Sequence, residues 1–178
     1  FTFLMLLNSF KNFVKGVSSV KIGYWRENER KLRGNEIFDK TLGIVGMGKI
    51  GREVMTRCRS FGMNILGFDP YMNQDMFNPE EVKIVDLDEL TADSDYITVH
   101  VPLTDTTRDL FDYERLSDMK RSARIVNVAR GGIINEADLA KALIHGKIAG
   151  AAIDVFTAEP VDESNPLLNN QKVLQDYL

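Results

Sequence analysis

The chain has 178 residues, of which 44% are hydrophobic and 27% charged, a composition typical of a globular protein. Its net charge of −4 argues against general nucleic-acid affinity. The single cysteine, Cys58, excludes an internal disulfide and fits a reducing compartment. The apolar stretch 1–7 is too short to cross a bilayer. We therefore expect a cytoplasmic protein with neither a nucleic-acid nor a membrane partner.

Residues 1–17 carry apolar side chains at helical spacing and predict an amphipathic helix that Gly16 closes. A polar connector over 18–40 follows, with Tyr24 and Trp25. Beyond it, strand patterns alternate with helix patterns. The strand-like runs are 42–46, 64–68, 82–85, 96–100, 124–128 and 148–153, and the intervening helices are 49–61, 87–90, 113–119 and 136–145. This alternation predicts an α/β fold with a doubly wound parallel sheet of the Rossmann type.

The first strand leads into helix 49–61 through the motif Gly46-x-Gly48-x-x-Gly51. Glycines at these positions allow a sharp turn, a close approach of a diphosphate to the backbone, and tight packing of the helix. Free N–H groups at the helix start favour an anion. Asp69, at the end of the next strand, is placed to accept hydrogen bonds from ribose hydroxyls and would repel a 2′-phosphate. The pattern predicts NAD as the cofactor, the alternative being a glycine-rich turn with a surface aspartate.

Three more distinctive segments follow strands, at 100–104, 127–132 and 154–160. Ligands of doubly wound sheets bind at the carboxyl ends of the strands, so these segments and the glycine motif are expected to converge. The glycine motif, Asp69 and these three segments, taken in this order, resemble the cofactor domain of the D-isomer-specific 2-hydroxyacid dehydrogenases. The segments 59–63 and 150–156 are most similar to the phosphoglycerate dehydrogenase branch. The resemblance covers roughly residues 1–174.

The resemblance implies a 2-hydroxy or 2-oxo acid as substrate and two catalytic side chains. Arg130 matches the arginine that grips the substrate carboxylate and carbonyl, and Glu159 matches the carboxylate that pairs with a catalytic histidine. By residue type alone, the alternatives are a surface arginine in a helix-start loop and a solvated glutamate before a proline. The implied cofactor-binding positions, beside the three glycines and Asp69, are Lys49, Ile50, His100, Pro102, Thr104, Ala129 and Asp154. No metal site is predicted, and no catalytic role is expected of His145.

The family pattern continues to a Thr-Pro-His element that would fall at Leu178, and no histidine lies nearby. The family's substrate domain is also absent. We therefore expect a single NAD-binding domain over 1–178, in which 1–40 form the first helix and connector, 41–174 the Rossmann core and 175–178 a divergent tail. Weak or absent turnover is expected of the chain alone. A catalytically silent NAD-binding or dimerisation module is the alternative, and a methyltransferase would leave Arg130 and Glu159 unexplained.

The resemblance also suggests a two-fold homodimer through this domain. The first helix carries an apolar stripe that either packs on the chain's own sheet or forms such an interface. The stripe comprises Phe3, Leu6, Leu7, Phe10 and Phe13.

Overall fold

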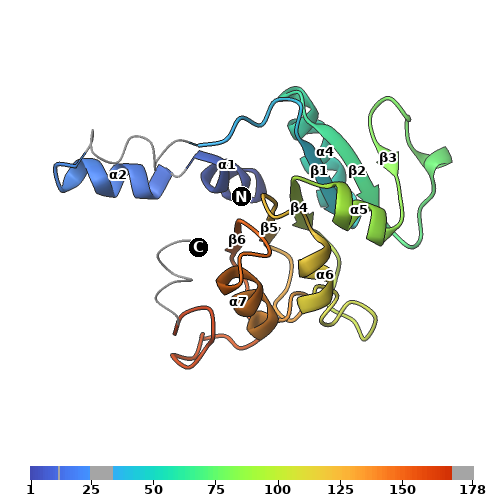
Figure 1. The fold of residues 1–178 in the computed structure, drawn as a ribbon. Coiled ribbons are helices and arrows are strands. Elements are labelled where there is room, and N and C mark those ends of the chain that lie inside the picture. The colour runs from blue at the N-terminus through green and yellow to red at the C-terminus, as the bar shows by residue number, and fades with distance from the viewer. Residues whose placement is uncertain (12, 25–33, 170–178) are drawn as a thin grey trace.

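The computed structural model describes residues 1–11, 13–24 and 34–169 (Figure 1). Its centre is one parallel six-stranded sheet in the order β3-β2-β1-β4-β5-β6. The order reverses between β1 and β4, which makes the sheet doubly wound and confirms the predicted fold class. The strands are β1 (Thr41–Val45), β2 (Asn64–Phe68), β3 (Lys83–Ile84), β4 (Tyr96–Val99), β5 (Arg124–Asn127) and β6 (Gly150–Ile153).

Helices connect the strands, and three of these helices have an aspartate or asparagine side chain as the N-terminal cap. The side chains of Asp86, Asp112 and Asn135 each accept a hydrogen bond from the backbone N–H three residues later. This pairing satisfies an N–H group that would otherwise lack an intrahelical partner. The elements are α1 (Thr2–Lys11), α2 (Phe13–Lys21), α4 (Lys49–Ser60), the 3₁₀ turn η1 (Gln74–Met76), α5 (Leu87–Asp93), α6 (Tyr113–Asp118) and α7 (Glu136–Ile144).

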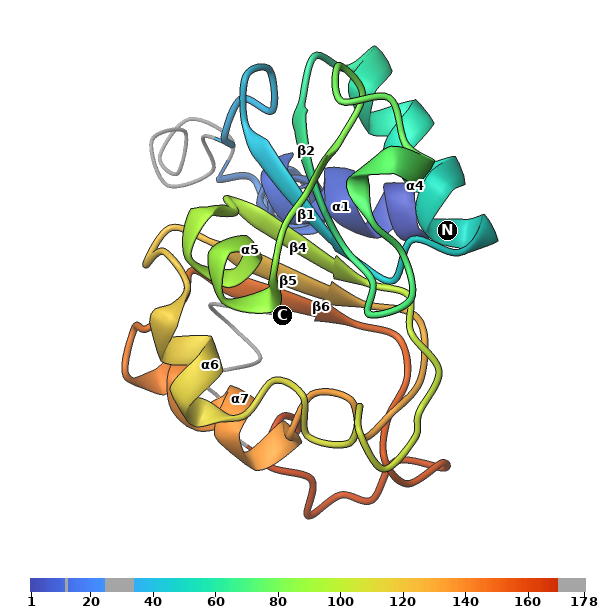
Figure 2. The same cartoon turned by 90° about the vertical axis from the view of Figure 1, so that its right-hand side faces the viewer.

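The helices cover the two faces of the sheet as separate layers, with α1 and α4 on one face and α5, α6 and α7 on the other (Figure 2). Leu6 of α1 and Val54 of α4 belong to one buried cluster, whereas Leu90, Leu116 and Leu139 belong to the other. Each face of the sheet is therefore buried, as its Ile- and Val-rich strands require.

Cys58 lies in α4 and is fully buried. Burial raises the pKa of its thiol to about 12, because the charged thiolate is poorly solvated there. The side chain is therefore an inert part of the core.

The N-terminal region departs from the single helix predicted over 1–17. Two helices, α1 and α2, occupy it, and Gly16 lies inside α2, which runs on to Lys21. A glycine within a helix costs only about 1 kcal/mol relative to alanine, so it is a weak signal of a helix end. Residues 18–21 of the predicted connector are therefore helical, and Trp25 lies outside the described residues.

The apolar stripe of α1 packs on the chain's own sheet. Leu6 is fully buried beside β5 and β6 side chains, and the ring of Phe3 lies 4.9 Å from that of Phe61. The side chains of Phe10 and Phe13 lie outside the description. The stripe was expected either to pack on the chain's own sheet or to form a dimer interface. The structure shows packing on the sheet for its N-terminal part.

Four strands end one residue earlier than predicted, at Val45, Ile84, Val99 and Asn127. At the first of these, Gly46 has a φ of 100°, which turns the chain out of the sheet. The last strand begins at Gly150 rather than at 148. The helix predicted over 87–90 begins at Leu87, where Asp86 caps its start, and continues to Asp93.

Candidate functional site

The carboxyl ends of five strands form one row across the sheet. Val45 pairs in register with both Phe68 and Val99, and Asn127 pairs with both Val99 and Ile153. The residues that follow these strand ends are thereby brought to one edge, and Figure 2 shows the arrowheads of β4, β5 and β6 pointing to the same side. Residues placed there by the register are Gly46, Asp69, His100, Val128 and Asp154. The convergence predicted from the strand-end motifs is present.

The glycine turn after β1 uses each of its three glycines differently. A Cβ on Gly51 would lie 2.1 Å from the carbonyl oxygen of Gly46, so α4 packs against the turn at a distance only glycine permits. A Cβ on Gly46 would lie 2.8 Å from the carbonyl carbon of His100, which brings the turn against the loop after β4. A Cβ on Gly48 would meet no atom within 4 Å, so the turn is open at that point. Ile50 is exposed beside it.

The open side of the turn has the donors that a dinucleotide diphosphate requires. Within the described residues, the backbone N–H groups of residues 48 to 51 donate to no protein acceptor. They begin the 12-residue helix α4, whose N-terminal dipole favours negative charge. Lys49 and Ile50 would meet a diphosphate there through their backbone. The residues present therefore fit NAD.

Asp69 has a second role that sequence reasoning did not foresee. One carboxylate oxygen accepts a hydrogen bond from the N–H of Met47 at 3.0 Å, and the other accepts one from the N–H of Tyr71 at 3.0 Å. The carboxylate therefore holds the glycine turn against the end of β2. Since a carboxylate can accept about four hydrogen bonds, acceptor sites are left for ribose hydroxyls.

The loop after β4 carries the predicted cofactor positions His100, Pro102 and Thr104. The hydroxyl of Thr107 donates to the carbonyl of Pro102 at 2.6 Å and accepts from the N–H of Thr104 at 2.8 Å. The hydroxyl of Thr104 lies within hydrogen-bond distance of the Thr106 and Thr107 hydroxyls. The backbone of this loop is therefore set by a cluster of threonines before any ligand arrives.

Burial lowers the pKa of His100 from its ordinary value of 6.5 to about 4. Its Nε2 lies 3.0 Å from the hydroxyl of Thr98. The ring is therefore neutral at neutral pH, with one nitrogen bonded to the strand that precedes it.

Acidification should destabilise the fold through His100. As pH falls from about 6.5 toward 4, the unfolded chain takes up a proton that the folded chain does not, so the free energy of unfolding decreases. We expect a loss of about 1 to 2 kcal/mol between pH 7 and pH 5 that His100→Gln abolishes. Denaturant unfolding at both pH values measures it, with His145→Gln as control. Equal losses in His100→Gln and in the wild type would contradict this account.

The loop after β5 presents Arg130. The side chain of the buried Asn127 spans the turn, accepting from the N–H of Ala129 at 3.0 Å and donating to the carbonyl of Arg130 at 2.9 Å. The guanidinium of Arg130 is exposed and donates to the carbonyl of Ala129 at 2.7 Å. In the described ranges it makes no ion pair, so its charge is available to an anionic ligand.

The loop after β6 carries Glu159, whose carboxylate accepts a hydrogen bond from the N–H of Phe156 at 3.1 Å. Glu136, the first residue of α7, holds this loop in place. Its carboxylate accepts from the N–H and the hydroxyl of Thr157 at 2.6 and 2.8 Å, and from the amide of Asn165 at 2.5 Å. Sequence reasoning treated Glu136 only as a helix start, because its partners lie more than twenty residues away in the chain.

The Arg130 and Glu159 loops also touch each other through backbone. A Cβ on Gly131 would lie 1.9 Å from the carbonyl oxygen of Phe156. The structure therefore brings the two predicted catalytic loops together through Gly131, although the two side chains themselves do not pair.

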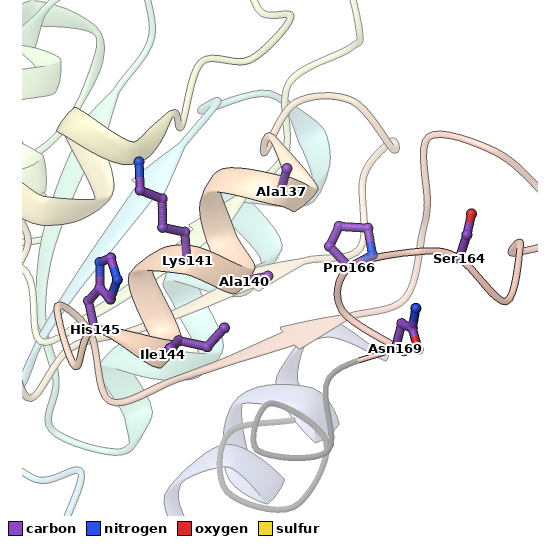
Figure 3. A pocket seen from close by; sticks show the side chains of 8 residues that line it. All are labelled: Ala137, Ala140, Lys141, Ile144, His145, Ser164, Pro166 and Asn169. Carbon is purple, nitrogen blue, oxygen red and sulfur yellow. The ribbon is translucent and has the colours of Figure 1, made fainter.

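A separate hollow of about 420 Å³ lies along α7 (Figure 3). Its lining comprises Ala137, Ala140, Lys141, Ile144, His145, Ser164, Pro166 and Asn169. None of these is a predicted site residue, and His145 bonds to Tyr113 at 2.9 Å at the far end of α7. Because α7 leads from the end of β5 back to the start of β6, His145 lies at the edge opposite the strand-end site.

Fold and strand-end site together define a dinucleotide-binding domain of the Rossmann type. Residues 3–175 match the D-isomer specific 2-hydroxyacid dehydrogenase, NAD binding domain. The chain belongs to that family. No helix among the described residues is long and apolar enough to cross a membrane.

Three relatives illustrate the likeness. The chain is 43% identical to D-3-phosphoglycerate dehydrogenase of Methanocaldococcus jannaschii, over 96% of this chain and 32% of the relative. It is 38% identical to glyoxylate reductase of Korarchaeum cryptofilum, over 98% of this chain and 53% of the relative. NAD-dependent formate dehydrogenase from Staphylococcus aureus, crystallised with NAD, superimposes with a TM-score of 0.87 at 34% identity, over 96% of this chain and 51% of that one. The chain thus spans about a third to a half of the length of these relatives.

Proposed function

We propose that this chain is the cofactor-binding part of an NAD-dependent oxidoreductase that interconverts a D-2-hydroxy acid and the corresponding 2-oxo acid. The observation that carries the proposal is the open glycine turn, with free N–H groups on one side and Asp69 in register beside it. In this proposal the Rossmann core spans 41–174, preceded by 1–40 and followed by the tail 175–178. D-3-phosphoglycerate is the first substrate to test, because a relative 43% identical is named for it.

In such a reaction, each of the residues at the strand ends has a different role. When bound, NAD accepts or supplies the hydride. The guanidinium of Arg130 offers a rigid fork of donors that binds the substrate carboxylate and polarises its carbonyl. Glu159 would stabilise the charged form of a histidine that moves the hydroxyl proton. Asp154 follows β6 at the same edge, and in this proposal it binds the nicotinamide carboxamide.

Neither histidine of this chain is placed to move that proton. His145 lies at the opposite edge of the sheet, and His100 is held neutral by burial beside the glycine turn. We therefore propose that the isolated chain binds NAD but turns over weakly or not at all. The second candidate, a silent NAD-binding or dimerisation module, shares the cofactor site.

Calorimetric titration with NADH tests the cofactor proposal. Asp69→Ala removes the ribose acceptor and the bond to the Met47 N–H, so we expect binding about tenfold weaker. Asp69→Asn keeps an acceptor for that N–H and should lose less. Asp75→Ala, which removes a carboxylate exposed in η1, is the matched control. A folded wild-type chain that binds no NADH would refute the proposal.

A homodimer and a cytoplasmic location complete the proposal. Exposed apolar side chains on and after α2, which reaches away from the sheet in Figure 1, support an interface. They are Val17, Val20, Ile22 and Tyr24. The buried, unpaired Cys58 is compatible with a reducing compartment.

Sedimentation at micromolar concentration should show a dimer that Val20→Asp weakens, because a charge cannot be buried unpaired at an apolar interface. Glu53→Gln, on the exposed side of α4, should leave the association unchanged. A wild-type chain that sediments only as a monomer would refute the dimer.

A further inference from the structure

The guanidinium of Arg52 joins two parts of the cofactor site that the chain places far apart. Its Nε donates to the carbonyl of Met47 in the glycine turn at 3.0 Å. Its Cζ lies 4.5 Å from the centre of the Phe77 ring, and one Nη lies 3.6 Å from the sulfur of Met72. Phe77 and Met72 belong to the segment after β2, which begins with Asp69. We call Arg52, Met72 and Phe77 the loop clamp.

Met47 is held from both sides by opposite charges. The carboxylate of Asp69 accepts from its N–H at 3.0 Å, whereas the guanidinium of Arg52 donates to its C=O at 3.0 Å. The side chain of Met47 is fully buried, which fixes the residue from a third direction. Hydrogen bonds to charged groups are roughly twice as strong as those between neutral groups. The residue between the first two glycines therefore has little freedom to rotate.

Fixing two carbonyls fixes the two N–H groups that follow them. In a trans peptide, the C=O of one residue and the N–H of the next point in opposite directions. Arg52 binds the C=O of Met47 through its side chain and the C=O of Gly48 through its own backbone N–H, at 3.0 Å. The N–H groups of Gly48 and Lys49 are thereby directed away from Arg52, and within the described residues neither donates to a protein acceptor.

We propose that Arg52 is a positioning residue for the cofactor diphosphate, acting through the glycine turn. The loop clamp sets the direction of the Gly48 and Lys49 N–H groups and links it to the segment that carries Asp69. The inference rests on the proposed binding of NAD. The guanidinium works through its Nε and its planar face, so charge alone does not suffice. A lysine at this position would place a methylene where Nε lies.

Binding of three ligands by four variants tests the proposal. Arg52→Met and Arg52→Lys should each weaken NADH and ADP binding about tenfold, while adenosine, which lacks phosphates, should bind within about twofold of wild type. Phe77→Leu should weaken NADH and ADP about threefold through loss of the cation–π contact. Arg57→Met is the matched control, because Arg57 is exposed on the same helix and pairs with Glu53. Calorimetry suits NADH and ADP, and an NMR titration suits adenosine.

Two results would overturn the positioning role. If Arg52→Lys binds NADH like the wild type, charge alone accounts for the effect. If adenosine binding falls in step with ADP binding, Arg52 does not act through the diphosphate turn.

A readout without ligand separates this inference from the proposed function. The hydrogen bond from the Met47 N–H to Asp69 should protect that amide from exchange, and Arg52→Met should speed its exchange while the middle of α4 is unchanged. If the wild type binds no NADH, the proposed function fails, and the exchange alone decides whether the clamp exists. Unchanged exchange at Met47 would overturn it.

Discussion

Gly48→Ala should weaken NADH binding by about 100-fold while leaving the fold intact. The added methyl group meets no protein atom within 4 Å, so nothing in the folded chain opposes it. It occupies the open side of the turn, where the diphosphate must approach the backbone. Loss of two charge-assisted hydrogen bonds accounts for a change of this size.

Thermal unfolding of the same variant supplies the control. The φ of Gly48 is −69° with extended ψ, a conformation that alanine adopts without strain. An alanine in place of an N-cap glycine costs about 1 kcal/mol or less, so the melting temperature should fall by a few degrees at most. Wild-type affinity for NADH would show that no phosphate passes close to Gly48. A collapse in stability would show that the turn is less open than described.

The order of elements was predictable because each strand is buried on both faces and reads as a short apolar run. The helix starts at Asp86, Asp112 and Asn135 likewise depend on residues three apart. The division of the N-terminal region into α1 and α2 was not predictable from the sequence. Packing of Leu6 against the sheet, rather than local propensity, places the first helix. Gly16 was a misleading signal because a glycine inside a helix costs only about 1 kcal/mol relative to alanine.

In the candidate site too, some residues were predictable from the sequence and others were not. Asp69 was predictable from its spacing after the glycine motif, and Arg130 and Glu159 from the resemblance. Their supports were not predictable, since Arg52 meets Phe77, and Glu136 meets Thr157, only after the sheet has assembled. The roles given to the site residues stay predictions until binding and activity are measured, whereas the convergence of their loops follows from the strand register.

Gly131→Ala should destabilise the fold by about 3 kcal/mol or more and disturb both predicted catalytic loops. Its Cβ would lie 1.9 Å from the carbonyl oxygen of Phe156 and 2.5 Å from the N–H nitrogen of Thr157, so the backbone must move. Overpacking of this kind typically costs 1 to 3 kcal/mol, occasionally more. For a chain of this size, the melting temperature should fall by roughly 6 to 12 °C.

Gly132→Ala separates the steric effect from backbone strain. Gly132 has a φ of 80°, which disfavours alanine by about 1 to 2 kcal/mol, but its Cβ would meet nothing closer than 3.6 Å. It should therefore destabilise the chain less than Gly131→Ala, and amide exchange should rise mainly in its own loop. In Gly131→Ala, exchange should rise in the Arg130 loop and at Phe156 and Thr157 together. If only one loop responds, the backbone contact does not couple the arginine and the glutamate, and their relative placement must depend on Glu136 instead.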